Sequence, residues 1–271
     1  MKTFRSFIVF SVGTVLLLLL RTWQLLFMFE TATGFYKPQY SPVGAIICEA
    51  TFVLVLALIV CFPLLQKVQF VCHFEKRPFM IVASLLTSFT YIYKASCLAF
   101  TFGILSIDFI LTLLAGLFFF LYGLFGFLKI TMPLVFSLAP LPLWLYKLFV
   151  VFLAQSGVSR FTENAYEIIT LCVILLFLLN CAKFLSNVEK QHSLRFLTAT
   201  GFLTATLCFV YTIPRYLVSV LGASQFLHHS LQPDVTVLGT GIFALALTFY
   251  CLRYGTNKPA TDDCNTTLTA D

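Results

Sequence analysis

Charged residues are scarce in this sequence: Asp, Glu, Lys and Arg together make up 10% of its 271 residues. A soluble domain carries about 25% charged residues, which it needs to cover its surface. Apolar residues instead reach 60%, and the mean hydropathy is +0.96. These proportions exclude a soluble enzyme, a nucleic-acid-binding protein and a disordered chain. They leave a multi-spanning membrane protein, with the lipid bilayer as its first partner.

The signatures of common catalytic and metal sites are also missing. The sequence contains no CxxC, HExxH, GxSxG or Walker A pattern. Cys72-His73 is the only Cys–His neighbour pair, and it offers two of the roughly four ligands that a metal site needs. We therefore expect no metal, no cofactor and no enzymatic activity.

Small residues recur within the apolar runs. Gly239 to Ala244 fits the pattern G-x-G-x-x-A, but it lacks the preceding strand that a dinucleotide site requires. Close helix packing explains it better, and it also explains the small pairs Ser84 with Ser88 and Gly201 with Ala205.

A helix needs about 20 apolar residues to cross a bilayer. Eight stretches of this kind occur, and they do not alternate as the strands of a barrel would. We predict an all-α bundle of eight membrane helices, in a single domain over residues 1–254, with a short polar cytoplasmic tail at 255–271. The predicted spans are 6–29, 42–65, 79–102, 106–127, 131–155, 164–186, 196–221 and 235–253.

The first stretch resembles a signal peptide, because Lys2 and Arg5 precede an apolar core. The apolar run resumes after Gln24, and no small-x-small cleavage site follows the core directly. An uncleaved first span is therefore favoured over a cleaved leader.

The distribution of cations predicts the orientation, because Lys and Arg accumulate on the cytoplasmic side. With a cytoplasmic N-terminus, eleven of the 17 cations fall on the inside, three on the outside and three within spans. The inside set is Lys2, Arg5, Lys67, Lys76, Arg77, Lys129, Lys183, Lys190, Arg195, Arg253 and Lys258, and the outside set is Lys37, Arg160 and Arg215. Both termini are thus expected in the cytoplasm, with the chain in the cell membrane.

The sequence predicts where several helices start. Ser41 precedes Pro42, Ser106 can cap the fourth span with Asp108 in its first turn, and Asn164 with Glu167 matches a capping box. Polar residues near the outer boundary are interpreted mostly as caps, dipole partners and rim charges. They are Glu30, Asp108, Glu163, Glu167, Asp234 and Arg215.

The fifth span is interrupted by Pro133, Pro140 and Pro142. Because an interior Pro removes a hydrogen bond and clashes with the preceding turn, we predict non-helical or kinked backbone at residues 139–142. This break is either a plain proline kink or one wall of a substrate site, as in transporters with broken helices.

Four charged residues lie deep inside the spans: Arg21, Glu49, Lys94 and Lys147. At about 1.5 Å per residue, they fall roughly 10–12 Å below the outer helix ends. Charges at such depth are costly, and three cations face one anion. We expect the four to line a cavity that binds an anionic ligand or a lipid headgroup. The alternative is a structural ion pair with two lysines that extend toward the headgroups.

Three short segments resemble parts of an uncharacterised family of multi-spanning bacterial plasma-membrane proteins. They are Thr33-Gly34-Phe35-Tyr36, residues 162–167 and residues 180–186. The resemblance implies a bacterial plasma-membrane location and adds no site residue. The leading hypothesis for function is a small permease-like or ligand-binding membrane component. The alternatives are a scaffold, sensor or assembly partner with other membrane subunits, and thirdly an intramembrane enzyme.

Overall fold

The computed structural model describes residues 2–28, 37, 42–64, 78–128, 134–155, 161–185, 192–220 and 234–254. Over these ranges it is helical without strands, and eight apolar helical segments are long enough to cross a membrane. The predicted all-α bundle of eight spans is confirmed, and the protein is an integral membrane protein. The predicted tail at 255–271 lies outside the described residues.

Seven of the eight α-helices follow the predicted spans closely, whereas the fifth begins at residue 141 instead of 131, and two short irregular helices accompany them. The helices are α1 (Lys2–Trp23), α2 (Pro42–Leu64), α3 (Pro78–Phe102), α4 (Ile107–Leu128), α5 (Leu141–Gln155), α6 (Phe161–Leu185), α7 (His192–Val220) and α8 (Val235–Tyr254). A π-helix, η1 (Gln24–Met28), continues α1, and a 3-10 helix, η2 (Leu134–Leu138), precedes α5.

Local sequence explains several helix ends. Pro42 and Pro78 open α2 and α3, where a missing N–H costs nothing. Gly103 ends α3 with a φ of 85°, a conformation that suits glycine. The predicted cap of α4 is confirmed, because Ser106 Oγ accepts a hydrogen bond from the backbone N–H of Phe109 at 3.3 Å. The short turn at 103–106 makes α3 and α4 an antiparallel hairpin.

The capping box predicted at Asn164 and Glu167 is wrong. Helix α6 begins at Phe161, so Asn164 lies within its first turn instead of preceding it. Glu167 is therefore about two turns into the helix, and its side chain lines a cavity described below.

The break in the fifth span is confirmed. The 3-10 helix η2 ends at Leu138, a turn follows at residues 139–140, and α5 begins at Leu141. The N–H of Ala139 donates to the carbonyl of Phe136 at 3.1 Å, which closes the 3-10 turn. Pro142 then occupies the first turn of α5, where its missing N–H breaks no hydrogen bond.

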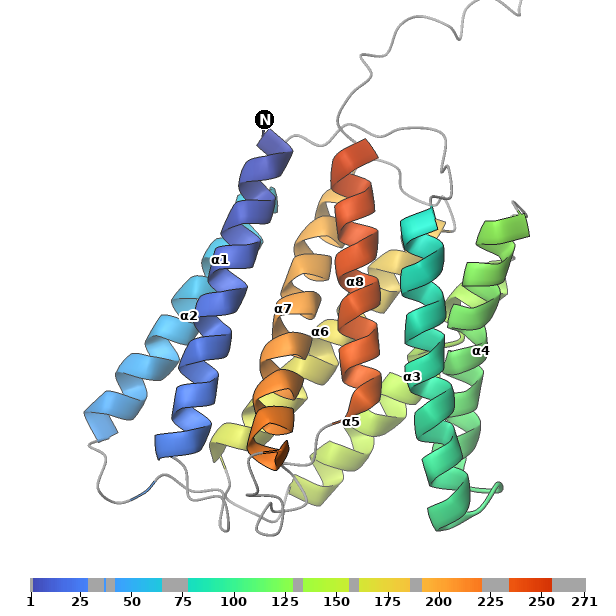
Figure 1. Ribbon diagram of the computed structural model, residues 1–271, viewed down its shortest axis with the longest axis horizontal. Coiled ribbons are helices and arrows are strands. Elements are labelled where there is room, and N and C mark those ends of the chain that lie inside the picture. Colours follow the sequence, from blue (N-terminus) through green and yellow to red (C-terminus); the bar gives the residue numbers. More distant parts are fainter. Residues whose placement is uncertain are drawn as a thin grey trace, which may run out of the picture.

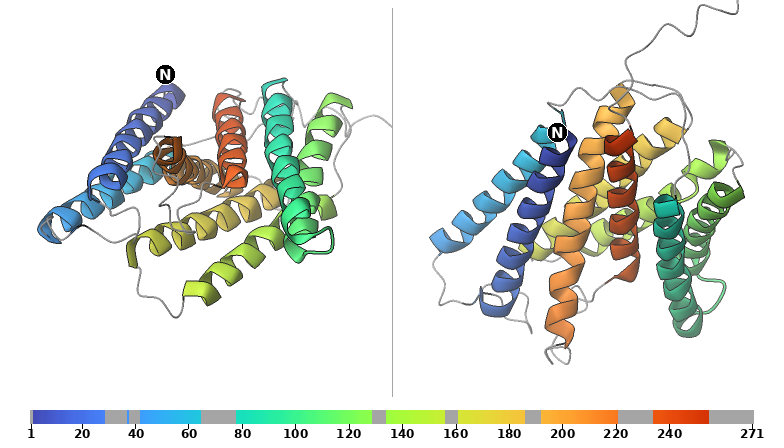
Figure 2. Two further views of the ribbon diagram at one scale, coloured as in Figure 1. Left: turned by 60° about the horizontal axis from the view of Figure 1, so that its bottom comes forward. Right: turned by 45° about the horizontal axis from the view of Figure 1, so that its top comes forward.

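Helix α7 is central to the bundle. It packs against α1, α2, α6 and α8, while α3 packs between α4 and α8. Figure 1 shows α1 and α2 at one edge, α3 and α4 at the other, and α7 and α8 between them. Helices α5 and α6 cover one side of this row, as Figure 2 shows from below. Accordingly, 72% of the α8 span is buried, against 17% of the α2 span.

Small residues permit the closest helix contacts, as predicted. A Cβ atom on Gly241 would lie 2.7 Å from Cβ of Cys208, and one on Gly239 would lie 3.2 Å from Cβ of Thr90. The first distance is shorter than two carbon atoms tolerate, so α8 can lie this close to α7 only with a glycine there.

Hydroxyl groups join α3 to α4. Ser88 Oγ donates to the carbonyl of Gly116 at 3.0 Å, and Ser84 Oγ donates to the carbonyl of Phe119. These interhelical hydrogen bonds occur where the small side chains let the two backbones approach. The hairpin is thus held along its length and at its turn.

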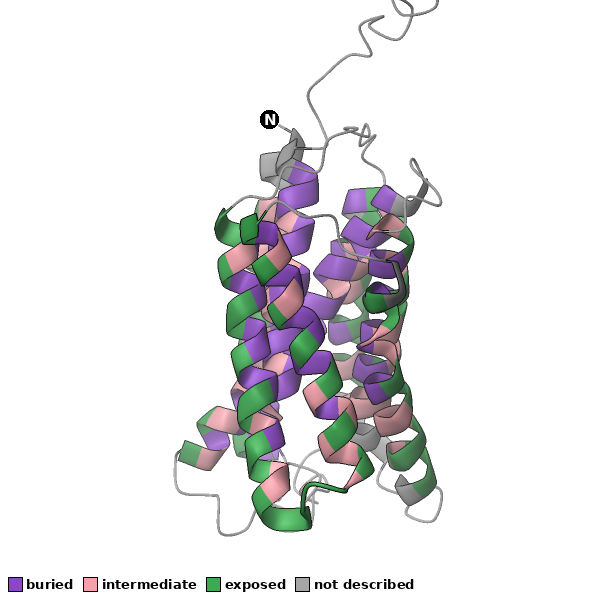
Figure 3. Cartoon of the chain, turned by 90° about the vertical axis from the view of Figure 1, so that its right-hand side faces the viewer, coloured by how far each residue is buried: buried purple, intermediate pink, exposed green. Residues whose placement is uncertain are grey.

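Apolar side chains cover the outward faces of the helices. Figure 3 shows exposed residues along the outside of the bundle and buried ones between the helices. Phe89 and Val82 on α3, for example, are 67% and 63% exposed. An apolar exterior around a packed interior is the pattern of a protein that contacts lipid.

Candidate ligand-binding cavity

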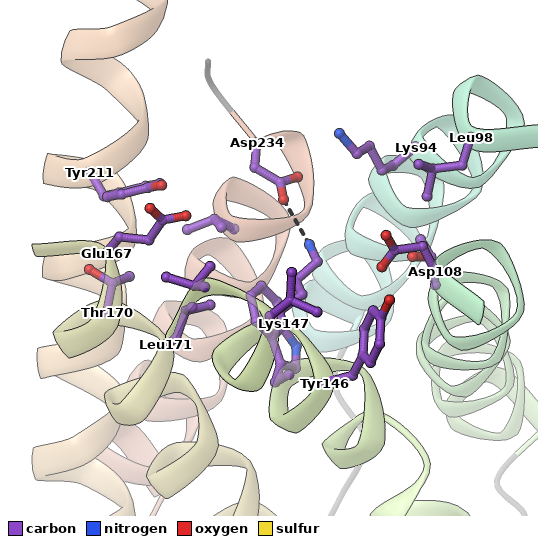
Figure 4. Close-up of a pocket in the computed structure, with 15 residues that line it drawn as sticks. Lys94, Leu98, Asp108, Tyr146, Lys147, Glu167, Thr170, Leu171, Tyr211 and Asp234 are labelled. Atoms are coloured by element: carbon purple, nitrogen blue, oxygen red, sulfur yellow. Dashed lines mark hydrogen bonds and ion pairs between the residues drawn. The ribbon is translucent and has the colours of Figure 1, made fainter. Parts of the chain in front are cut away.

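A cavity of about 360 Å³ opens at the end of the bundle opposite Lys2, here called the distal end. Ligand sites in proteins typically measure about 300–1,000 Å³. Its walls come from six helices, and Figure 4 shows them. The lining residues are Lys94, Leu98, Asp108, Thr112, Trp144, Tyr146, Lys147, Val150, Val151, Glu167, Thr170, Leu171, Tyr211, Asp234 and Val237.

An ion pair between α5 and the start of α8 crosses the middle of this cavity. Lys147 Nζ lies 2.7 Å from Asp234 Oδ2 and donates a second hydrogen bond to Thr236 Oγ1 at 2.9 Å. Asp234 also caps α8, because its Oδ1 accepts the N–H of Thr236 at 3.0 Å. The interpretation of Asp234 as a cap is therefore correct, but it omits the ion pair.

The electrostatics of Asp234 reflect two nearby lysines. Burial by itself raises the pKa of this carboxyl. The ammonium groups of Lys147 and Lys94, with hydrogen bonds from Lys147 and the N–H of Thr236, outweigh burial and hold the pKa well below its usual value. Asp234 is thus an anion at every physiological pH.

Lys94 and Asp108 occupy the α3–α4 side of the cavity. In Figure 4 the ammonium group of Lys94 extends toward Asp234, and the carboxylate of Asp108 points into the cavity above the hydroxyl of Tyr146. Within the described ranges, neither Lys94 nor Asp108 has an oppositely charged group at ion-pair distance, 4.0 Å or less. Each therefore interacts electrostatically with the opposite charges of the cavity only over distances longer than 4.0 Å.

The opposite wall combines a carboxylate, a phenol and a guanidinium. The carboxylate of Glu167 lies beside the hydroxyl of Tyr211, and Arg215 exerts a favourable electrostatic interaction on it. The guanidinium carbon of Arg215 lies 3.7 Å from the centre of the Tyr211 ring. Arg215 is only 2% exposed, so the interpretation of this residue as a rim charge is wrong.

A buried hydrogen-bond chain forms the floor. Trp144 lines the cavity, and its Nε1–H donates to the Tyr91 hydroxyl at 3.1 Å. The Tyr91 hydroxyl is in turn 2.7 Å from Thr240 Oγ1. Satisfied buried networks hold their side chains in one arrangement, so the floor is a rigid surface.

Arg21 and Glu49 belong to a separate cluster around Tyr166. The Tyr166 hydroxyl donates to Glu49, while the guanidinium carbon of Arg21 lies 4.2 Å from the Tyr166 ring centre. Arg21 also donates to Gln24 Oε1 at 3.0 Å. A small space of about 10 Å³ also lies beside Arg21.

The structure thus divides the four predicted site residues into two pairs. Lys94 and Lys147 line the 360 Å³ cavity, whereas Arg21 and Glu49 lie in the neighbouring cluster. Tyr211 connects the two, since it lines the cavity and also the small space beside Arg21.

The carboxylates of the cavity were not among the site residues predicted from the sequence. Among described side chains, each spanning segment or its start brings one charge to the distal end, and these four cations are matched by four anions. In chain order they are Arg21, Glu49, Lys94, Asp108, Lys147, Glu167, Arg215 and, immediately before α8, Asp234. Lys37, which lies outside the spans, is a further cation there. The sequence carries a sign of this arrangement, because each span or its start contributes one of these charges.

Among the described residues, no three His, Cys, Asp or Glu side chains are grouped so as to hold a metal ion. Comparisons of the chain with protein families, curated proteins and solved structures find no match.

Proposed function

We propose that the protein binds a small polar solute in the 360 Å³ cavity, as a permease-like or solute-binding component of the plasma membrane. The distal end faces outward, and both termini are cytoplasmic. One observation supports the proposal above all: five charged side chains, from α3, α4, α5, α6 and the start of α8, line one cavity of ligand size. Ionisable groups at membrane depth are costly and mark substrate pathways.

A purely structural role, as in a scaffold or assembly partner, explains the ion pair between Lys147 and Asp234. It explains the other charged residues of the cavity less well. A protein that uses charges only for folding stabilises itself by pairing them directly or by replacing them with apolar residues. Lys94 and Asp108 share a cavity and yet stand apart from each other. Their separation favours a ligand that contacts both.

The broken fifth span supplies an adaptable wall. Helix α5 contributes five lining residues, and the turn at residues 139–140 separates it from η2. Because the break interrupts the backbone hydrogen bonds of the span, α5 can tilt without distorting η2. Discontinuous helices flank the substrate sites of several transporter folds.

The proposed topology predicts the outcome of thiol labelling in a variant whose native cysteines are replaced. A cysteine at Leu105, 92% exposed in the turn between α3 and α4, should react with a membrane-impermeant reagent on intact cells. A cysteine at Lys183, near the opposite end of α6, should react only after the cells are opened. The reverse pattern would contradict the orientation.

Filling the cavity should weaken solute binding. Val150 lines the cavity and is 43% exposed, so Val150→Trp adds bulk there without displacing a buried group. The test screens amino acids, amines, carboxylates, phosphates and sugars for compounds that raise the Tm of the purified protein. We expect Val150→Trp to weaken binding of an active solute at least about tenfold, about 1.4 kcal/mol. Uptake into proteoliposomes should fall in parallel.

Phe152→Trp is the matched control, because Phe152 lies on the same helix, is 61% exposed and does not line the cavity. It should leave binding and uptake unchanged. If no class of solute raises the Tm of the wild-type protein, or if both variants behave alike, the proposed function is wrong.

A further inference from the structure

We infer that the solute is a zwitterion: a small molecule with one anionic group, carboxylate or phosphate, and one ammonium group. Lys94 binds the anion, and Asp108 binds the ammonium. This inference rests on the proposed function and specifies its ligand. The proposed ligand keeps the anionic group that was expected to bind the lysines, and it adds a cationic group.

The charge of the cavity favours a zwitterion. Its lining holds two cations and three carboxylates. Lys147 and Asp234 pair with each other at 2.7 Å, while Glu167 is hydrogen-bonded to Tyr211 and attracted by Arg215. Lys94 acts on Asp234 only at longer range, so among the described residues Lys94 and Asp108 are the two charges of the cavity that have no oppositely charged group within 4.0 Å. A pure anion would satisfy Lys94 but would be repelled by Asp108, and a pure cation would have the opposite defect.

The separation of the two groups also favours a ligand between them. In a partly buried site, opposite charges attract and stabilise each other when they touch. Lys94 and Asp108 nevertheless lie more than 4.0 Å apart and both face the cavity. A zwitterion that lies between them gives each group an opposite charge, and the hydroxyl of Tyr146, which points toward Asp108, offers a further hydrogen bond to the ammonium.

The α3–α4 hairpin also holds the two residues in place. Lys94 and Asp108 lie on the two arms of the α3–α4 hairpin, which is clamped by hydrogen bonds from Ser84 and Ser88 and closed by a short turn. The two groups therefore keep their spacing when α5 moves. Preorganised contacts raise affinity because little freedom is lost on binding.

The size of the cavity limits the ligand. At about 30 Å³ per water molecule, 360 Å³ has room for roughly a dozen waters, or for a solute of similar heavy-atom count. An amino acid or phosphoethanolamine fits this description. The same chemistry occurs in the headgroup of phosphatidylethanolamine, so the source is either a free solute or a lipid.

Binding to the purified protein separates zwitterions from singly charged compounds. The compounds are glycine, β-alanine, γ-aminobutyrate and phosphoethanolamine, with butyrate and butylamine as analogues that each lack one charge. We expect the best zwitterion to bind about ten- to a hundredfold tighter than either analogue, since each analogue forfeits one charged contact. Lys94→Met and Asp108→Asn should each remove this advantage, while Lys183→Met, far from the cavity, should retain it.

Charge reversal gives a test that misfolding cannot imitate. Lys94→Glu places two carboxylates on the hairpin and should change the preference to a diamine such as 1,4-diaminobutane. Asp108→Lys should change it to a dicarboxylate such as succinate. The double variant of Lys94→Asp with Asp108→Lys should again prefer zwitterions.

Native mass spectrometry in nanodiscs of equal phosphatidylethanolamine and phosphatidylglycerol distinguishes the two sources. If the wild type retains phosphatidylethanolamine, Asp108→Asn loses it and no free zwitterion binds, the ligand is the lipid headgroup. If butyrate or butylamine binds as tightly as the zwitterions, the inference is wrong while the proposed function stands. If no zwitterion binds from solution or from lipid, the inference is likewise overturned.

Discussion

Replacing Asp234 with alanine is expected to destabilise the protein by about 3 kcal/mol. The substitution leaves the ammonium group of Lys147 in a half-buried site without its partner, and breaking such a pair costs about 3–5 kcal/mol when burial is complete. The side chains of Lys147 and Asp234 are 17% and 23% exposed, which places the cost at the lower end. Loss of the cap at Thr236 adds to it. Unfolding in mixed micelles of increasing denaturing-detergent content measures the change.

Two controls separate the ion pair from the cap. Asp234→Asn keeps a capping side chain and removes the charge, and its combination with Lys147→Met should recover most of the lost stability. The folded-state pKa of Asp234 lies below the ordinary value of about 3.9, so the pair stabilises the fold fully above that pH and progressively less below it. Acidification below about pH 4 should therefore destabilise the wild type more than the double variant. Equal acid sensitivity of the two proteins would contradict this assignment.

The fold was predictable because its main cause is local. Each span is a run of apolar residues about as long as the bilayer is thick, and lipid leaves the backbone no alternative to a helix. The break before α5 is equally local, since Pro140 and Pro142 cannot continue the hydrogen bonds of a preceding helix. The start of α6 was harder to predict. This helix begins at Phe161, one turn before Asn164, although Asn164 has the better capping side chain.

The grouping of the charges could not be read from the sequence. Counting residues from a helix end gives the depth of a side chain, but it does not give its direction around the helix or the identity of the neighbouring helix. Arg21 and Lys147 have similar depths, yet α1 packs beside α2 and α7 whereas α5 packs beside α4 and α6. One layer of charge therefore became two clusters.

The position of Asp108 and Asp234 in the cavity was missed for a related reason. Asp108 and Asp234 stand at helix starts, where capping and dipole effects explain an acidic residue without any ligand. In the structure, the starts of α4 and α8 lie near the lysines of α3 and α5, so these acidic residues at helix starts also line the cavity. Counting these charges span by span would have shown that the cations and the anions are equal in number.

Removing Arg215 is expected to affect both stability and solute binding. Its guanidinium is almost fully buried, stacks on Tyr211 and compensates Glu167. Arg215→Leu should destabilise the fold by about 3 kcal/mol, because it leaves the Glu167 carboxylate poorly compensated and removes the stacking contact. Arg215→Lys should recover only part of this, since an ammonium group does not stack as the planar guanidinium does.

A double-mutant cycle with Glu167→Gln tests the coupling that this expectation assumes. In the Glu167→Gln background, Arg215→Leu should cost at least 1 kcal/mol less than in the wild type, a typical coupling energy for residues in one network. Arg195→Leu, on the same helix but near its opposite end, is the matched control and should show no such coupling. Solute affinity, measured alongside, should fall in Arg215→Leu because Glu167 becomes the uncompensated anion of the cavity wall. Additive effects of Arg215→Leu and Glu167→Gln on stability would show that the two residues act independently, and Tyr211 would then be held by its packing alone.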